Sequence, residues 1–173
     1  MIPMDPLATM SQPATLRPAG PDDAPAIVAL IRELAVYEKL EDQAIATPED
    51  LLRHLFGDRP AAEVILAELD GEAVGYALFF PTFSTFRGQP GLYLEDIFVR
   101  PGHRGRGIGK ALLTHLAGLA LGRGCGRLEW SVLDWNEPSI GFYRSLGAVP
   151  MDEWTVYRLA DSALAELANK SKN

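Results

Sequence analysis

The sequence predicts a mixed α/β fold: a single domain with a central, mostly antiparallel mixed sheet flanked by helices. A chain of 173 residues with 47% hydrophobic residues has the size and apolar content of one ordinary domain. Apolar, β-rich runs on both sides of Asp70-Gly71 indicate a hairpin. An apolar strand over residues 91–99 then leads through a glycine-rich loop into a helix, as in mixed α/β folds.

Helical spacing of apolar residues predicts a first helix within residues 21–42, with Asp22 or Asp23 capping its start. Thr47 is expected to cap a second helix, with Asp50 completing a capping box. A short strand precedes both helices, and residues 81–91 are rich in turn formers and predict a loop. The next predicted elements are, in order, helix, strand, helix and strand over residues 108–122, 125–134, 136–147 and 153–159. Residues 161–170 are either a short C-terminal helix or a frayed tail.

The composition of the chain excludes several classes of function. A formal net charge of −7 argues against general nucleic-acid binding, which needs a broad basic face. The single Cys125 excludes an intrachain disulfide, and no cluster of metal-binding side chains is apparent. No apolar run approaches the roughly 20 residues of a membrane span. The start of the chain does not resemble a secretory signal, so we expect residues 1–13 to be a flexible tail, residues 14–173 the folded domain, and the protein cytoplasmic.

The stretch RPGHRGRGIGK, residues 100–110, gathers positive charge on flexible backbone in an acidic chain. A glycine-rich loop before a helix presents free N–H groups and the positive end of the helix dipole, so it can hold a pyrophosphate. Arg104, Arg106 and Lys110 add charge there. The spacing fits neither the dinucleotide fingerprint nor the Walker loop, and a merely solvated basic turn stays open as the alternative.

Two acids interrupt the apolar strand. Because side chains alternate, we predict Glu95 on the face of Tyr93 and Asp96 on the opposite face with Leu94 and Phe98. A carboxylate kept in such a strand is used, for example to bind a cationic amine or take its proton, or is paired or solvated.

The segment WNEPSIGFY predicts a helix with donor groups along one face. Asn136, Ser139 or Ile140, and Tyr143 recur at helical spacing, and Asn136 is a plausible N-cap. A tyrosine there can protonate a leaving group. The alternative is a core tyrosine whose hydroxyl is satisfied by backbone.

Together these motifs resemble the GCN5-related N-acetyltransferase (GNAT) superfamily, and within it the diamine (spermidine/spermine-type) and thialysine acetyltransferases. The resemblance runs from about residue 16 to about residue 159. The matching segments are RELAVYE at 32–38, YLEDIFV at 93–99, RGRGIG at 104–109 and WNEPSIGFYRSLGA at 135–148.

The resemblance implies acetyl-CoA as cofactor, with strand backbone holding its pantetheine arm and the loop holding its pyrophosphate. The residues it assigns to cofactor binding are Ile97, Phe98, Val99, Arg104, Gly105, Arg106, Gly107, Ile108, Gly109, Lys110, Asn136 and Ser139. It implies that Tyr143 is the general acid and that Glu95 binds and deprotonates a small primary amine. The residues on the substrate side are Tyr37, Glu38, Glu95, Asp96, Glu129, Trp130 and Ser131, the last three lining the same cleft. A homodimer is implied as well, and no metal.

One segment departs from the polyamine-acetylating pattern. Ser84 and Thr85 stand where an acid is expected, and Arg87 would repel a long polycation. This favours a lysine-like amino acid, a short diamine or another small amine. A protein or peptide N-acetyltransferase and a non-catalytic acyl-CoA sensor are the competing hypotheses.

Overall fold

The computed structural model describes residues 13–170 and divides into two compact units, one ending at Ser131 and one beginning at Val132. The flexible tail expected for residues 1–13 lies almost wholly outside the described residues. The first unit contains a five-stranded sheet in the order β1-β2-β3-β4-β5, antiparallel except for the parallel pair β4–β5, which confirms the predicted fold class. The strands are β1 Thr15–Pro18, β2 Glu63–Leu69, β3 Glu72–Ser84, β4 Gln89–Val99 and β5 Leu128–Trp130.

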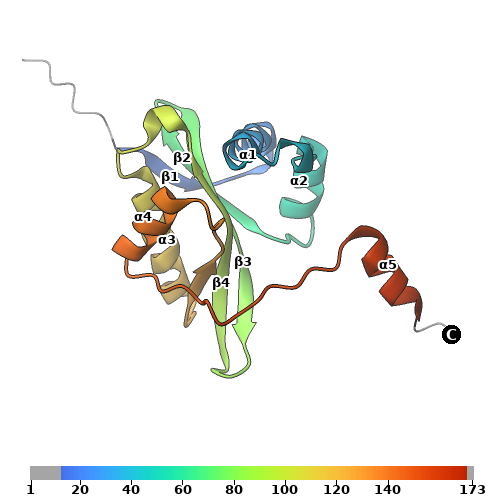
Figure 1. Ribbon diagram of the computed structural model, residues 1–173. Coiled ribbons are helices and arrows are strands. Elements are labelled where there is room, and N and C mark those ends of the chain that lie inside the picture. Colours follow the sequence, from blue (N-terminus) through green and yellow to red (C-terminus); the bar gives the residue numbers. More distant parts are fainter. Residues whose placement is uncertain (1–12, 171–173) are drawn as a thin grey trace, which may run out of the picture. The chain divides into compact units, whose positions relative to one another are not determined.

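Helices cover both faces of this sheet (Figure 1). α1 (Ala24–Glu38) and α2 (Pro48–Leu55) lie on one face, and α3 (Ile108–Gly122) packs against β2, β3 and β4. The core beneath α1 includes Tyr76 and Phe98, which pair across β3 and β4. Three short 3-10 helices, η1 Pro21–Asp23, η2 Glu41–Gln43 and η3 Pro101–His103, connect these elements.

Local signals explain most of the boundaries. Asp70 and Gly71 both have positive φ, at 51° and 81°, as a tight hairpin turn requires, which confirms that prediction. The N–H of Asp50 donates to the Thr47 hydroxyl at 3.2 Å, and the N–H of Thr47 donates to the Asp50 carboxylate at 3.0 Å, which confirms the capping box. Asp23 behaves differently, because its carboxylate accepts from the Gly20 N–H and pairs with Arg17 instead of capping α1.

The loop predicted over residues 81–91 is wrong. β3 and β4 continue through most of it, and only residues 85–88 form the turn. Gly88 closes that turn at φ 62°, and its N–H donates to the Ser84 carbonyl at 2.8 Å. At Gly91 a Cβ would stand 2.8 Å from the Thr82 hydroxyl, so glycine here permits close strand packing and is not a turn signal.

The second unit contains α4 (Glu137–Ser145), as predicted, and α5 (Asp161–Asn169), which is the helical of the two alternatives for its segment. The last predicted strand, over residues 153–159, is wrong. In the described chain that segment has no strand partner, and a strand forms only when its backbone groups are paired. The strand predicted over residues 125–134 shrinks to the three residues of β5. Among residues 13–170 no helix is both long enough and apolar enough to cross a membrane.

Candidate active site

A β-bulge sits where the two acids interrupt β4. Leu78 of β3 pairs with Asp96, whereas the next residue, Phe79, pairs with Leu94. Glu95 is therefore the extra residue on β4, with no partner in the register. The regular hydrogen-bond pairing of β3 with β4 is therefore interrupted at Glu95, the residue that the sequence motif predicts to be catalytic.

The bulge changes which side chains share a face. Asp96 and Phe98 pair with Leu78 and Tyr76, so they lie on the α1 face of the sheet. Tyr93 pairs with residue 80 of β3 and lies on that same face. The prediction that Asp96 points away from Tyr93 is wrong, because strict alternation holds only in a regular strand and the extra residue shifts it by one.

Asp96 is a half-buried carboxylate with one hydrogen-bond donor. The Tyr76 hydroxyl donates to its Oδ2 at 3.1 Å. Burial raises the pKa of Asp96 to about 6; the Tyr76 hydrogen bond opposes this rise, and the charges of Glu95 and Glu38 add to it. Burial likewise raises the pKa of Tyr76, so the phenol stays protonated as a donor.

Glu38 comes from the last turn of α1, on the same side of the sheet. The helix ends directly after it, at Lys39 with φ 60°. Burial raises the pKa of the Glu38 carboxyl. Three acids from α1 and β4, Glu38, Glu95 and Asp96, are thus close enough to influence one titration, that of Asp96. Such a cluster favours a cation.

Glu95 itself is exposed and forms no ion pair with any residue that the structure describes. An exposed carboxylate on a bulge can approach an incoming ligand without first breaking an internal contact. Of the two alternatives to a functional role, pairing is therefore wrong for Glu95, which is solvated.

The edge of β4 that faces β5 is only partly occupied. β5 pairs with Leu92–Leu94 and then ends at Trp130. From Glu95 to Val99 that edge has no strand partner among residues 13–170, so backbone donors and acceptors remain for a ligand, apart from the Val99 carbonyl, which accepts from Arg104. Ile97, Phe98 and Val99 lie on this stretch, as the resemblance expects of residues beside a pantetheine arm.

The glycine-rich loop has the geometry of an anion cradle. Gly105 and Gly107 adopt φ 75° and 79°, and the space that a Cβ would fill at either is open. Gly107 is the N-cap of α3, and no side chain caps the first turn, which begins at Ile108, Gly109 and Lys110. Among the described residues neither Arg106 nor Lys110 is in an ion pair. The loop therefore fits a pyrophosphate.

Arg104 has a different environment from the other basic residues of the loop. Its Nε donates to the Val99 carbonyl at 2.8 Å. Its guanidinium lies 4.5 Å from the centre of the Tyr37 ring and 5.6 Å from that of Phe98. Arg104 therefore ties the loop to the end of β4 and to α1, a role that its charge alone does not predict.

The candidates Glu129 and Trp130 of β5, and Ser131 directly after it, are divided between the two faces of the sheet. Glu129 pairs with Tyr93, and the Ser131 and Tyr93 hydroxyls are hydrogen-bonded at 2.7 Å. Trp130 pairs with Leu94 on the opposite face, so the three do not line one surface. Oε2 of Glu129 lies 2.8 Å from Nε of Arg127, an ion pair without hydrogen-bond alignment.

The second unit holds the remaining candidates on α4. Asn136 is buried and caps the helix, its Oδ1 accepting from the Ser139 N–H at 3.4 Å, as predicted. The ring of Tyr143 packs at a tilt against Phe142, with 5.5 Å between centroids. Gly147 follows the helix with φ 87°, which confirms the predicted stop.

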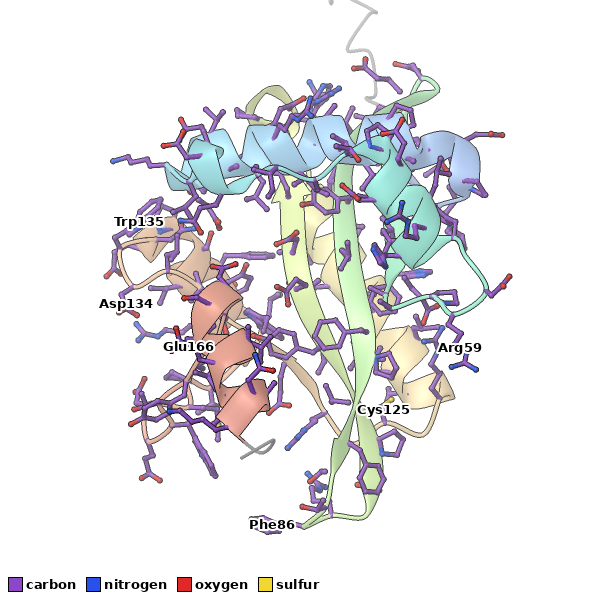
Figure 2. The ribbon with its side chains drawn as sticks, turned by 90° about the vertical axis from the view of Figure 1, so that its right-hand side faces the viewer. Arg59, Phe86, Cys125, Asp134, Trp135 and Glu166 are labelled. Atoms are coloured by element: carbon purple, nitrogen blue, oxygen red, sulfur yellow. The ribbon has the colours of Figure 1, made fainter. Side chains whose placement is uncertain are left out.

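Residues 84–87, which differ from the polyamine-acetylating pattern, lie at the tip of the β3–β4 hairpin. Figure 2 shows Phe86 there, pointing away from the sheet, and 97% of its surface is exposed. Ser84 is buried and its hydroxyl accepts from the Arg87 N–H. Ser84 lies six positions along β3 from Leu78, the pairing partner of Asp96, which is about 20 Å along the strand. Within the first unit, Arg87 does not border the acid cluster.

Tyr76 is the site residue that sequence reasoning missed. It stands in the apolar run VGYAL, where it reads as one more core residue. The available signal was its hydroxyl, because a buried phenol needs a hydrogen-bond partner. Once the register of the β3–β4 hairpin is known, the Tyr76 hydroxyl and the nearby Asp96 carboxylate become a candidate hydrogen-bonded pair.

This fold, with its bulged acidic strand and uncapped glycine-rich helix start, defines an acyltransferase domain. Residues 29–148 match the Acetyltransferase (GNAT) family, and the chain belongs to that family. The protein is an acyltransferase enzyme, and the diamine and thialysine branch expected from its motifs is confirmed by its relatives.

The chain is 40% identical to a thialysine N-epsilon-acetyltransferase of Bos taurus over 90% of this chain and 97% of that protein. It is 34% identical to an L-ornithine N5-acetyltransferase of Arabidopsis thaliana, covering 86% of this chain and 85% of the relative. Among solved structures it resembles an integron cassette protein of V. cholerae, with a TM-score of 0.78 and 28% identity over 91% of this chain and 98% of that one.

Proposed function

We propose that the protein is an N-acetyltransferase that moves an acetyl group from acetyl-CoA to a primary amine of a small cationic substrate. The observation that carries this proposal is the acid cluster of Glu38, Glu95 and Asp96 beside an unpaired strand edge and an anion cradle. The acids suit the cationic amine, and the cradle suits the anionic cofactor.

The residues of the first unit fit acetyl-CoA. N–H groups from Gly105 to Lys110 would hold the pyrophosphate, with Arg106 and Lys110 adding charge. Backbone of Ile97, Phe98 and Val99 would hold the pantetheine arm and polarise the carbonyl. Asn136 and Ser139 would contact the cofactor from α4. When bound, acetyl-CoA supplies the acetyl group as a reactive thioester.

The amine needs to lose a proton before it can react. An ammonium has no free lone pair, so Glu95, directly or through water, would accept its proton. The neutral amine would then bond to the acetyl carbon as the carbon–sulfur bond breaks. Tyr143 would give its proton to the departing thiolate and regain one, directly or through water, from the nitrogen as the amide forms. Tyr37, Glu38 and Asp96 would line the amine side. Glu129 and Ser131 would contribute from the same face of the sheet, and Trp130 from the opposite face.

The substrate class follows from charge. The relatives are named for thialysine and ornithine, amino acids with a side-chain amine. We propose a lysine-like amino acid or a short diamine ahead of a long polyamine, because these two names point to a small amine and the 84–87 segment supplies no acid for the far end of a polycation. We also propose a cytoplasmic homodimer. Large apolar residues exposed between Val149 and Leu167 of the second unit support the dimer.

A turnover screen tests the proposal. The protein is mixed with acetyl-CoA and, separately, thialysine, lysine, ornithine, short diamines, spermidine or a lysine-containing peptide, and thiol release is measured with mass detection of the product. We expect turnover with a small amine. Turnover with the peptide alone would favour a protein acetyltransferase, and acetyl-CoA binding without turnover of any amine would favour an acyl-CoA sensor.

A further inference from the structure

Tyr76 and Asp96 form a pair at the buried end of the acid cluster. The Tyr76 side chain has no exposed surface and stands in the core beneath α1. Its hydroxyl reaches Oδ2 of Asp96 across the β3–β4 pair, at 3.1 Å. No described residue donates a hydrogen bond to the other carboxylate oxygen, Oδ1. One oxygen is therefore fixed and the other is left for a ligand.

The two charged groups that influence the titration of Asp96, Glu38 and Glu95, both oppose its ionisation. Glu38 faces it from α1, and Glu95 precedes it on β4. Arg104 approaches from the following loop, but its guanidinium lies over Tyr37 and its Nε bonds to the Val99 carbonyl. Asp96 has no ion-pair partner in the described part of the chain, so Tyr76 is its sole source of stabilisation there.

We propose that Tyr76 is a positioning residue that keeps the Asp96 carboxylate ionised and turns its Oδ1 toward the cationic amine. The inference rests on the proposed function only in assigning an amine to this acid cluster. A hydroxyl suits the task because it donates a hydrogen bond without adding a positive charge that would repel the substrate. An arginine in the same place would neutralise the cluster.

Tyr76→Phe removes the hydroxyl and keeps the ring that fills the core. Carbon-13 NMR of the Asp96 carboxyl in the full chain is expected to show its titration moved upward by on the order of one pH unit. The acidic limb of kcat/KM for the amine should move with it. Near pH 6.5, KM for the amine should rise roughly three- to tenfold, with kcat and the KM for acetyl-CoA nearly unchanged.

Tyr93→Phe is the matched control, since it removes the hydroxyl of another tyrosine on the same face that bonds to Ser131 instead. It should leave the Asp96 titration in place. Unchanged Asp96 titration in folded Tyr76→Phe would overturn the proposal.

If Tyr76→Phe does not fold, 3-fluorotyrosine at position 76 gives the test with the opposite sign. Its more acidic hydroxyl is a stronger donor and should move the Asp96 titration downward; no movement would overturn the proposal. The NMR measurement needs no turnover. A failure to acetylate any amine would therefore count against the proposed function and not against the Tyr76–Asp96 pair.

Discussion

Asp96 is held in a charged form that the fold disfavours. Its folded pKa of about 6 lies above the ordinary aspartate value of 3.8, so the folded state binds the proton more tightly than the unfolded state. Stability is therefore lost as the pH rises through this range. Between pH 4 and pH 8 the loss from this one group is about 2 kcal/mol.

Asp96→Asn should reveal that loss. The amide is neutral at every pH, so the free energy of unfolding of the variant should exceed that of the wild type at pH 8 by about 2 kcal/mol more than at pH 4. Urea denaturation at the two pH values measures this. Equal differences at both pH values would contradict it. Amine turnover should fall in the same variant, so the group would be costly to the fold and useful to the site.

Glu95→Gln should mainly affect proton removal. We expect kcat/KM for the amine to fall by roughly 10²- to 10⁴-fold near pH 7. The deficit should shrink as the pH approaches the pKa of the amine, because more of the substrate is then already deprotonated. A pH series of initial rates checks this, with Asp58→Asn as an exposed, charge-matched control. A deficit that stayed constant with pH would remove Glu95 as the base.

Residue types were predictable at this site, whereas their relative placement was not. Glu95 and Asp96 were recognisable as candidates because carboxylates are rare inside an apolar strand. Their faces were assigned by alternation, which the bulge breaks. Arg104 was grouped with the cofactor by its charge, yet in the structure its guanidinium lies over Tyr37. Such contacts depend on registers and turns that pair distant segments.

At the scale of elements, the start of α3 depends on two glycines with positive φ. Gly107→Ala places a Cβ in open space, so the expected cost is backbone strain of about 1 kcal/mol in the free energy of unfolding. The added methyl also occupies the mouth of the cradle, so the affinity for CoA should fall. Thermal unfolding and calorimetric titration with CoA measure the two effects.

Gly102→Ala supplies the comparison for that experiment, because it also meets open space but needs no positive φ. It should alter neither stability nor CoA affinity appreciably. Equal behaviour of the two alanine variants would show that the conformation of Gly107 does not matter.

Elements with strong local signals were predictable. The hairpin at Asp70-Gly71 and the capped helix after Thr47 carry their own turn and cap chemistry. The 81–91 segment was predicted as a loop because Pro and Gly usually end strands. In the structure Pro90 stays within β4, and its carbonyl accepts a hydrogen bond from the Gly126 N–H. Residues 153–159 have a strand-like sequence, but a strand also needs a neighbouring strand to pair with. The sequence of the segment alone does not show whether that partner exists.

For the whole molecule, the second unit does not bury its large apolar side chains within its own fold. Val156 is 81% exposed and Tyr157 92% exposed. We expect the protein to sediment as a dimer and Val156→Asp to shift it toward monomer. Ser162→Asp, an exposed polar position on α5, is the control and should leave the mass unchanged. A wild-type monomer at tens of micromolar would contradict the dimer.

The extra residue in β4 is carried outside the regular pairing of the strand. Deleting Glu95 would remove the carboxylate and the bulge together, because Leu94 and Asp96 already pair with consecutive residues of β3, Phe79 and Leu78. Tyr93 and Asp96 would keep their faces, so the pairing that brings Tyr76 close to Asp96 should survive the deletion. The bulge therefore adds one carboxylate to the site without disturbing the pairing on either side of it.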